Sequence, residues 1–160
     1  MDQERTPTSS AGAPQGLLQA RVDEKGRLKL PVAAQQYLRE FGDSKVFITS
    51  LDGSTARIYP NSVWESNLEI FQQPQEDPEG VGDLYFLAQA YGEGGDIDGQ
   101  GRVLLPTNLR RELGLENETV WLERYKNRLT VYNNQRYEER KRRALQRTGT
   151  LADLERKGLR

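Results

Sequence analysis

The sequence predicts a β-rich α+β protein in which two copies of one small unit pack together as a pseudo-dimer around a shared β-barrel with flanking helices. The motif DEKGRLKLP at 23–31 recurs 75 residues later as DGQGRVLLP at 98–106. Short apolar segments bounded by turn residues follow each copy in the same order. Each unit has only about 50 residues and four short strands, too few for a satisfactory core of its own. Two such units in one chain therefore favour a common core.

The tight turn and helix after each motif begin the unit. In the first unit, strands are expected over 19–22 and 27–30, joined by a turn at 24–26 in which Gly26 can adopt positive φ. Pro31 and Pro106 each stand where the first turn of a helix tolerates proline. The later elements are helices over 32–41 and 107–113, hairpins over 45–59 and 118–132, and closing helices over 61–71 and 133–146.

The repeat divides the chain into five parts. Residues 1–16 are rich in Ser, Thr, Pro, Ala and Gly and predict a disordered tail. The other parts are the first unit at 17–71, an acidic linker at 72–91, the second unit at 92–147, and a C-terminal tail at 148–160. A short helix is expected within the linker, over 83–91. The segment 92–95 is interpreted as a turn and not as a phosphate loop, because no Lys-Ser/Thr follows it.

The composition excludes several classes of protein. The 160 residues contain neither Cys nor His, and the mean hydropathy is -0.82. These absences exclude disulfides, thiolate catalysis, Ser-His-Asp triads and the commonest metal ligands. No apolar run approaches the roughly 20 residues of a membrane helix, and residues 1–10 lack a signal-peptide core. The composition therefore favours a cytoplasmic protein without membrane contact that is not a hydrolase of a common type, and it leaves an enzyme only carboxylate, Lys, Tyr or Ser chemistry. Our prediction for the whole chain is no enzyme, no catalytic residue, no metal site and no cofactor.

The formal net charge of -1 conceals a strong segregation of charge along the chain. Residues 61–97 carry eight acidic residues and no Lys or Arg, whereas residues 133–160 carry nine basic and four acidic residues. The mean field of such a chain does not attract nucleic acid. Any contact with DNA must therefore come from a local basic surface, with the acidic middle held away from the phosphates.

The repeated motif supplies the candidate site. Arg27 and Arg102 each begin a strand beside an exposed turn, and a guanidinium there can contact guanine O6/N7 or phosphate. The alternative is that each Arg forms an ion pair with the Asp four residues earlier, Asp23 or Asp98, and holds the turn. Both can be true, since an Asp bound to the Arg would also orient it.

Other charged and aromatic residues were assigned by their place in the pattern. Lys25 and Lys29 flank Arg27, and strand alternation puts Arg27 and Lys29 on one face. Both lysines are therefore included in the predicted DNA-binding residues. Gly26 and Gly101 are expected to support the two turns.

Three basic residues of the first helices are expected on solvent-facing surfaces: Arg39, Arg110 and Arg111. The basic run 140–143, with Arg147, is either a phosphate patch or a helix end that balances the helix dipole and pairs with Glu138 and Glu139, and we favour the helix end. Four aromatic residues are expected in packing: Tyr59, Trp64, Trp121 and Tyr132.

The pattern Asp-x-x-Gly-Arg-apolar-x-Leu-Pro, followed by a helix and a β-hairpin, resembles the AbrB/MazE-like swapped-hairpin family. The second copy, DGQGRVLLPTNLRRELGLENETVWLERYKNRLTVY, is especially similar. The two copies in tandem over 17–147 resemble the MraZ transcriptional regulators. In each copy an aromatic residue, Trp64 or Tyr137, stands near the start of the last helix. This resemblance implies a nucleoid-associated bacterial repressor that forms ring-like homo-oligomers. It also implies binding to direct repeats in double-stranded promoter DNA upstream of the division and cell-wall gene cluster.

Two other classes were weighed. An antitoxin-like or scaffold protein would bind another protein through its helical tails, but such antitoxins typically carry one copy of the motif rather than two. A carboxylate enzyme would use Asp23 and Asp98 as a dyad across the pseudo-twofold. The Arg beside each Asp would lower the pKa of that carboxyl and prevent proton sharing.

Overall fold

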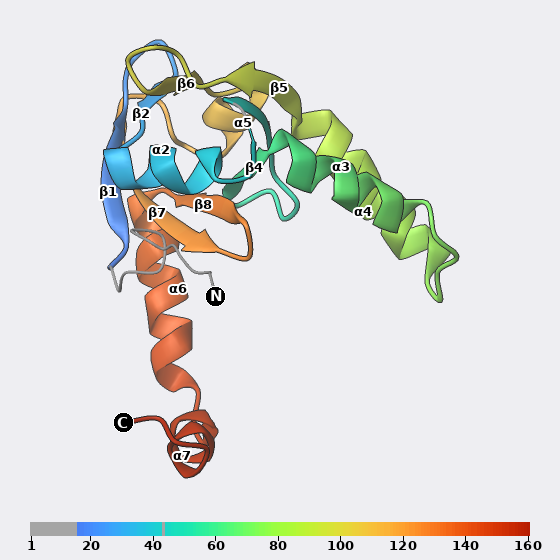
Figure 1. Ribbon diagram of the computed structural model, residues 1–160, viewed down its shortest axis with the longest axis vertical. Coiled ribbons are helices and arrows are strands. Elements are labelled where there is room, and N and C mark those ends of the chain that lie inside the picture. The colour runs from blue at the N-terminus through green and yellow to red at the C-terminus, as the bar shows by residue number, and fades with distance from the viewer. Residues whose placement is uncertain (1–15, 43) are drawn as a thin grey trace, which may run out of the picture.

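The computed structural model describes residues 16–42 and 44–160, so the predicted tail at 1–16 lies outside the described residues except for Gly16. One antiparallel sheet curves into a nearly closed barrel, and its strand order is β5-β3-β4-β8-β7-β1-β2-β6 (Figure 1). The strands are β1 (Leu18–Val22), β2 (Arg27–Lys29), β3 (Lys45–Thr49), β4 (Ala56–Pro60), β5 (Glu93–Asp96), β6 (Arg102–Leu104), β7 (Glu118–Tyr125) and β8 (Arg128–Tyr132).

Strand pairs of the two units are interleaved in the barrel, which confirms the predicted common core. The long strand β7 of the second unit pairs with β1 of the first, and β4 pairs with β8, β2 with β6 and β3 with β5. The loops cross over as well, because Leu30 N donates to Gly101 O and Leu105 N donates to Gly26 O, both at 2.9 Å. Neither unit could form this sheet without the other.

The core is filled by the inward side chains of both units. Each motif places one apolar residue between two outward ones, so Leu28 and Val103 are buried while their neighbours in β2 and β6 face outward. Further buried positions come from the helices and hairpins of both units: Leu38, Ile48, Ile58, Leu109, Leu122, Leu129 and Val131. The alternation visible in the sequence thus determines which face of each strand forms the core.

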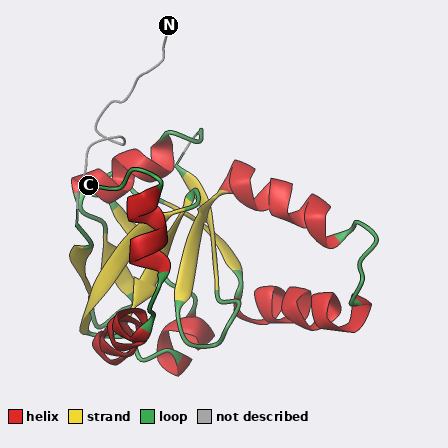
Figure 2. Ribbon diagram, turned by 90° about the horizontal axis from the view of Figure 1, so that it is seen from below, coloured by secondary structure: helices red, strands yellow, loops and turns green. Residues whose placement is uncertain are grey.

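The helices are α2 (Val32–Arg39), α3 (Asn61–Phe71), α4 (Pro78–Tyr91), α5 (Thr107–Glu112), α6 (Asn134–Gln146) and α7 (Thr150–Arg156). Helices α3 and α4 extend side by side away from the barrel as a helical hairpin, and α6 leaves the barrel in another direction to end at α7 (Figures 1 and 2). An aromatic cluster anchors the base of the hairpin, where the Trp64 ring stacks on Phe47 at 4.6 Å and lies 5.0 Å from Tyr59. The predicted packing role of Tyr59 and Trp64 is confirmed.

Two local predictions were wrong. Residues 92–95 were expected to be a turn, but Glu93–Asp96 forms β5 and pairs with β3, because tertiary pairing overrides the weak strand preference of glycine. A Cβ on Gly92 would collide with the Phe47 ring, so the close approach of this ring requires glycine at position 92. Helix α4 begins at Pro78 and not at 83, because the Asp77 carboxylate caps it by accepting from Gly80 N at 3.1 Å.

No helix in the described part of the chain combines the length and the apolar character needed to cross a membrane. Helix α7 lies within the segment predicted as a C-terminal tail.

Candidate nucleic-acid interface

The turn between β1 and β2 is organised by one carboxylate. Asp23 Oδ1 accepts from the backbone N–H groups of Lys25 and Arg27, both at 2.9 Å, and Asp23 Oδ2 accepts from Arg27 Nε at 2.8 Å. The carboxylate therefore fixes both the backbone of the turn and the direction of the guanidinium.

The turn between β5 and β6 repeats this geometry. Asp98 Oδ1 accepts from Gln100 N at 2.8 Å and Arg102 N at 2.9 Å, and Asp98 Oδ2 lies 3.3 Å from Arg102 Nε. In both turns the ion pair uses Nε, and within the described residues neither Arg has a hydrogen-bond partner at its terminal Nη atoms. The structural and the DNA-binding interpretations of each Arg are therefore compatible.

The pairing of β2 with β6 brings the two turns together. Lys29 lies opposite Arg102 and Arg27 lies opposite Leu104, so Arg27 and Arg102 are diagonal neighbours on the outer face. Diagonal neighbours in an antiparallel pair are about 7–8 Å apart. Their side chains keep 38% and 32% of their surface exposed. Both guanidinium groups are thus presented outward on one common face.

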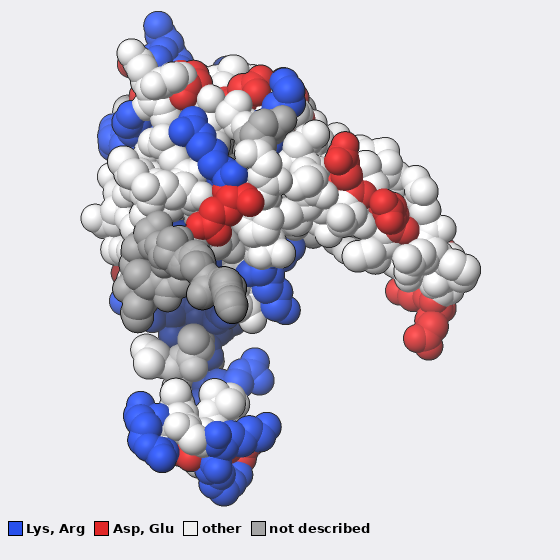
Figure 3. Space-filling model, viewed as in Figure 1, with Lys and Arg blue, Asp and Glu red and all other residues white. Residues whose placement is uncertain are grey.

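Three strands contribute cations to this face. Arg21 in β1 lies opposite Lys29 in β2, which in turn lies opposite Arg102 in β6, so the three form a row across the sheet. With Lys25 at the exposed tip of the first turn and Arg27, these residues are called the cationic face below. In Figure 3 blue atoms lie over these turns at the top with some red atoms among them, whereas only red charged atoms are visible along α3 and α4 on the right. The acidic segment is therefore held to one side of this face.

Arg21 is a residue of the cationic face that the sequence analysis did not assign to the site. Its Nη2 donates to Asn117 Oδ1 at 2.6 Å, which holds the side chain beside the row. The missing signal was the register that sets Arg21 opposite Lys29, since register follows from strand pairing and not from local alternation. Lys29 is also positioned from the second unit, because its Nζ donates to the carbonyl of Gln100.

The two units contribute unequally to the cationic face. Gln100 stands where the first unit has Lys25, and Leu104, 60% exposed, stands where it has Lys29. The basic character therefore comes mainly from the first unit, while the second supplies Arg102.

The two turn glycines are required by close approach as well as by positive φ. Gly26 has φ +86°, and a Cβ there would collide with the side chain of Arg110; Gly101 has φ +79°, and a Cβ there would collide with Gln35. Arg110 was expected on a solvent-facing helix surface, and this prediction was wrong. Its side chain is only 13% exposed, its Nε lies 2.7 Å from Glu116 Oε2, and its Nη1 donates to Leu105 O at 2.8 Å.

The carboxyl groups of the two turns have lowered pKa values. The backbone N–H of Arg27 is the main cause for Asp23, and that of Arg102 for Asp98, each outweighing the partial burial that raises the pKa. Neither Asp is thus poised to share a proton in the dyad that was considered. Within the described residues, no group of three or more acidic side chains is arranged to hold a metal ion.

These lowered pKa values predict an acid-dependent stability. The stabilisation by ionised Asp23 and Asp98 is present above their ordinary pKa of 3.8 and is lost as the pH falls through the lower pKa of the folded state. We expect the unfolding free energy of the unsubstituted protein to fall more steeply below about pH 5 than that of an Asp23→Asn, Asp98→Asn variant. Urea unfolding across this pH range measures the difference, and parallel pH profiles would contradict it.

The interleaved barrel and the paired turns define a duplicated swapped-hairpin protein with a cationic outer face. A family model described as "MraZ protein, putative antitoxin-like" matches residues 93–158. A protein of Acidobacterium capsulatum named "Transcriptional regulator MraZ" is 42% identical over 103 residues, which cover 62% of this chain and 68% of that protein. Proteins with the same name from Koribacter versatilis and Lachnoclostridium phytofermentans are 33% and 29% identical, covering 62% and 73% of this chain and 69% and 79% of theirs.

The chain belongs to the MraZ family, whose members are named as transcriptional regulators. This agrees with the resemblance found in the sequence and with the expectation that the protein is not an enzyme.

Proposed function

We propose that this protein is a sequence-specific DNA-binding repressor whose two Asp-x-x-Gly-Arg turns contact double-stranded DNA. The observation that supports this most strongly is the common outward face of Arg27 and Arg102, each held at Nε by its own Asp. Such a guanidinium retains its Nη atoms for a bidentate contact to guanine O6/N7 or to phosphate. Lys25, Lys29 and Arg21 would add phosphate contacts around them.

Repetition of this face would supply the affinity that a net charge of -1 does not. In a ring of identical copies, each copy would place its turns on one of several direct repeats, and linkage would raise the effective concentration of every further contact. Occupancy of the promoter would then obstruct RNA polymerase. From the family resemblance, the target would be direct repeats upstream of the division and cell-wall gene cluster, in the nucleoid of the cytoplasm.

Self-association is supported by the C-terminal arm, defined as residues 140–160. Every residue of this arm is exposed, including Leu145 at 79%, Leu151 at 64% and Leu154 at 44%. Exposed apolar residues that gather on one element mark an interaction surface. The arm is basic and the α3–α4 hairpin is acidic, so a head-to-tail contact between copies would be favourable, and contacts of this type generate rings when they close.

Substitution within the arm should therefore change the assembly before it changes the fold. We expect Leu151→Asp with Leu154→Asp to reduce the sedimenting mass to that of smaller species, because a charge cannot be buried unpaired in an interface. The matched control, Glu155→Asp, should keep the mass of the unsubstituted protein. An unchanged mass for the double variant would show that the arm does not join the copies.

A salt series on promoter DNA tests the proposed function. Affinity should fall steeply with salt, and it should exceed the affinity for scrambled DNA by about 10³-fold or more. A shallow slope, or equal affinity for both DNAs, would overturn the proposal.

The arm also supports the second candidate, an antitoxin-like or scaffold protein that binds another protein through its helical tail. A stoichiometric protein partner of the purified chain, together with no preference between promoter and scrambled DNA, would favour this candidate.

A further inference from the structure

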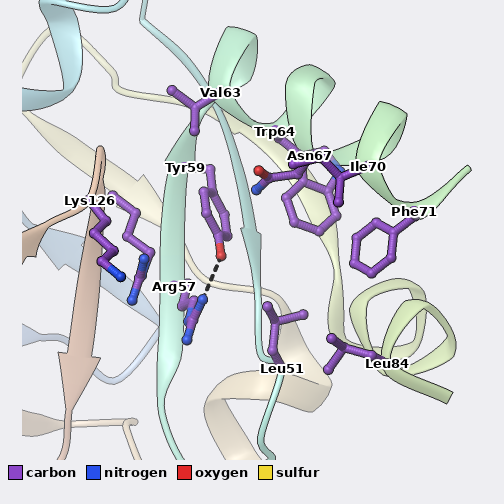
Figure 4. Close-up of a pocket in the computed structure, with 11 residues that line it drawn as sticks. Leu51, Arg57, Tyr59, Val63, Trp64, Asn67, Ile70, Phe71, Leu84 and Lys126 are labelled. Atoms are coloured by element: carbon purple, nitrogen blue, oxygen red, sulfur yellow. Dashed lines mark hydrogen bonds between the residues drawn. The ribbon is translucent and has the colours of Figure 1, made fainter. Parts of the chain in front are cut away.

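We propose that a pocket at the base of the α3–α4 hairpin binds a small amphipathic carboxylate, with a single anionic head and an apolar body. The pocket has a volume of about 400 Å³, a size typical of small-molecule sites, and Figure 4 shows the residues that line it. It shares no residue with the cationic face. The inference therefore goes beyond the proposed DNA function and does not depend on it.

One wall of the pocket is cationic. Arg57 lies in β4, Arg128 begins β8, and Lys126 belongs to the turn before β8. Arg57 lies opposite Thr130, so Arg57 and Arg128 are diagonal neighbours on the outer face of the β4–β8 pair. Within the described residues no carboxylate lines this pocket. Like charges at such a separation repel each other, and a bound anion would relieve that repulsion.

The Nε atom of Arg128 is unusual in lacking a hydrogen-bond partner within the described part of the chain, although it is buried. A buried donor without a partner costs free energy, and for a charged group the cost is larger. Within the described residues the charge of Arg128 has no carboxylate beside it in the pocket, and a bound carboxylate would compensate that charge.

The opposite wall is apolar and comes from the helical hairpin. Val63, Trp64, Ile70 and Phe71 of α3 and Leu84 of α4 face the strands across the pocket, with Tyr59 between the two walls (Figure 4). Ile70 is 57% exposed, so this surface is only partly covered by the protein itself. An apolar body laid against this wall would remove it from water.

The repeat-related position in the second unit shows what fills such a site. There Tyr132 replaces Tyr59, and its hydroxyl donates to Glu123 Oε1 at 2.7 Å. Glu123 lines that smaller pocket together with Arg140 and Lys141, so the cations there already have a carboxylate beside them. Burial and the hydrogen bond to Glu123 raise the pKa of Tyr132 to about 12, consistent with a stable hydroxyl–carboxylate pair.

In the first unit the two cross-strand positions beside the tyrosine carry different residue types. Thr49 stands at the position of Glu123, and its cross-strand partner is Arg57, where the second unit pairs Glu123 with Thr130. The Tyr59 hydroxyl accepts from Arg57 Nη1 at 2.9 Å instead of donating to a carboxylate. The first pocket thus has the corresponding tyrosine without an internal carboxylate. Its cations come from β4, β8 and the turn between β7 and β8, whereas those of the second pocket come from α6. A carboxylate from a ligand would supply the acidic group that the first pocket lacks.

Calorimetric titration of the full chain with decanoate, in the absence of DNA, tests the proposal. Decan-1-ol and decyltrimethylammonium serve as neutral and cationic probes with the same apolar body. We expect decanoate to bind at one site per chain and about tenfold or more tighter than decan-1-ol, because only the carboxylate forms charge-assisted hydrogen bonds. The cationic probe should bind most weakly.

Two variants locate the site. Arg57→Thr, which copies the second unit, and Arg128→Leu should each weaken decanoate binding about tenfold and leave decan-1-ol binding unchanged. Arg124→Leu, a matched substitution of a β7 cation that does not line the pocket, should bind decanoate as the unsubstituted protein does. The melting temperature of each variant without ligand reports its folding, and Arg128→Leu should not be less stable, since it removes the unpaired Nε.

The proposal is overturned if decanoate does not bind, if the acid and the alcohol bind equally, or if Arg57→Thr and Arg128→Leu bind decanoate normally while folded. A variant that lacks Arg27 and Arg102 should retain normal decanoate binding. Failure of the pocket and failure of the DNA interface would therefore be recognised separately.

Discussion

Replacing Arg27 and Arg102 together with Ala should abolish specific operator binding while the barrel remains folded and assembled. Each well-placed guanidinium contact to a base is worth about 1–3 kcal/mol, so losing two of them weakens binding from about 30-fold to about 10⁴-fold for each copy. In an assembly that contacts several direct repeats, the loss of binding free energy would be multiplied by the number of copies engaged. Gel-shift titration on promoter DNA measures this effect.

The fold should tolerate this double substitution because neither side chain supports the core. Both are about one-third exposed, and the bonds from Asp23 and Asp98 to the turn backbones do not involve the guanidinium groups. Exposed ion pairs of this kind contribute at most about 1 kcal/mol each. An Arg39→Ala, Arg111→Ala variant removes the same total charge from helices α2 and α5 and should bind operator nearly normally. Operator affinity equal to that of the unsubstituted protein in the Arg27, Arg102 variant would refute the assigned site.

The local structure of each unit could be predicted because its signals lie close together in the sequence. Alternation around Leu28 and Val103, the prolines before α2 and α5, and the short turns of the hairpins each act within a few residues. The repeat then indicated a shared barrel, since a unit of this size cannot bury a core alone. Strand β5 was missed because the glycines of 92–95 have no strand preference of their own, and their conformation comes from pairing with β3.

The candidate site was predictable in its residue types but not in its arrangement. The motif identified Arg27, Arg102 and their Asp partners, yet only the β2–β6 register places the two guanidinium groups diagonally on one face. The role of Arg110 depends on contact with a turn of the other unit, 84 residues away in the sequence, which no local pattern records.

Gly26→Ala should be among the most destabilising single substitutions in the chain, by about 2.5–5 kcal/mol. An alanine at φ +86° costs about 1–2 kcal/mol in backbone strain alone. Its Cβ would also displace the Arg110 side chain, which is held by Glu116 and by Leu105 O, and loss of a charge-assisted hydrogen bond adds about 1.5–3 kcal/mol. Urea unfolding at neutral pH measures the total.

The repeat provides matched controls for this substitution. Gly99→Ala lies in the equivalent turn with open space around it and no positive φ, so its unfolding free energy should change by less than about 0.5 kcal/mol. Gly101→Ala meets the neutral Gln35 and should cost less than Gly26→Ala, because the bond from Gln35 Nε2 to Leu30 O carries no charge.

A double-mutant cycle with Arg110→Ala separates the two causes. When the Arg110 side chain is absent, Gly26→Ala should cost only the backbone strain, about 1–2 kcal/mol, since nothing remains for the new Cβ to displace. If Gly26→Ala costs the same with and without Arg110, the two residues are not coupled. The contact between the first turn and the helix of the second unit would then not be what requires glycine at this position.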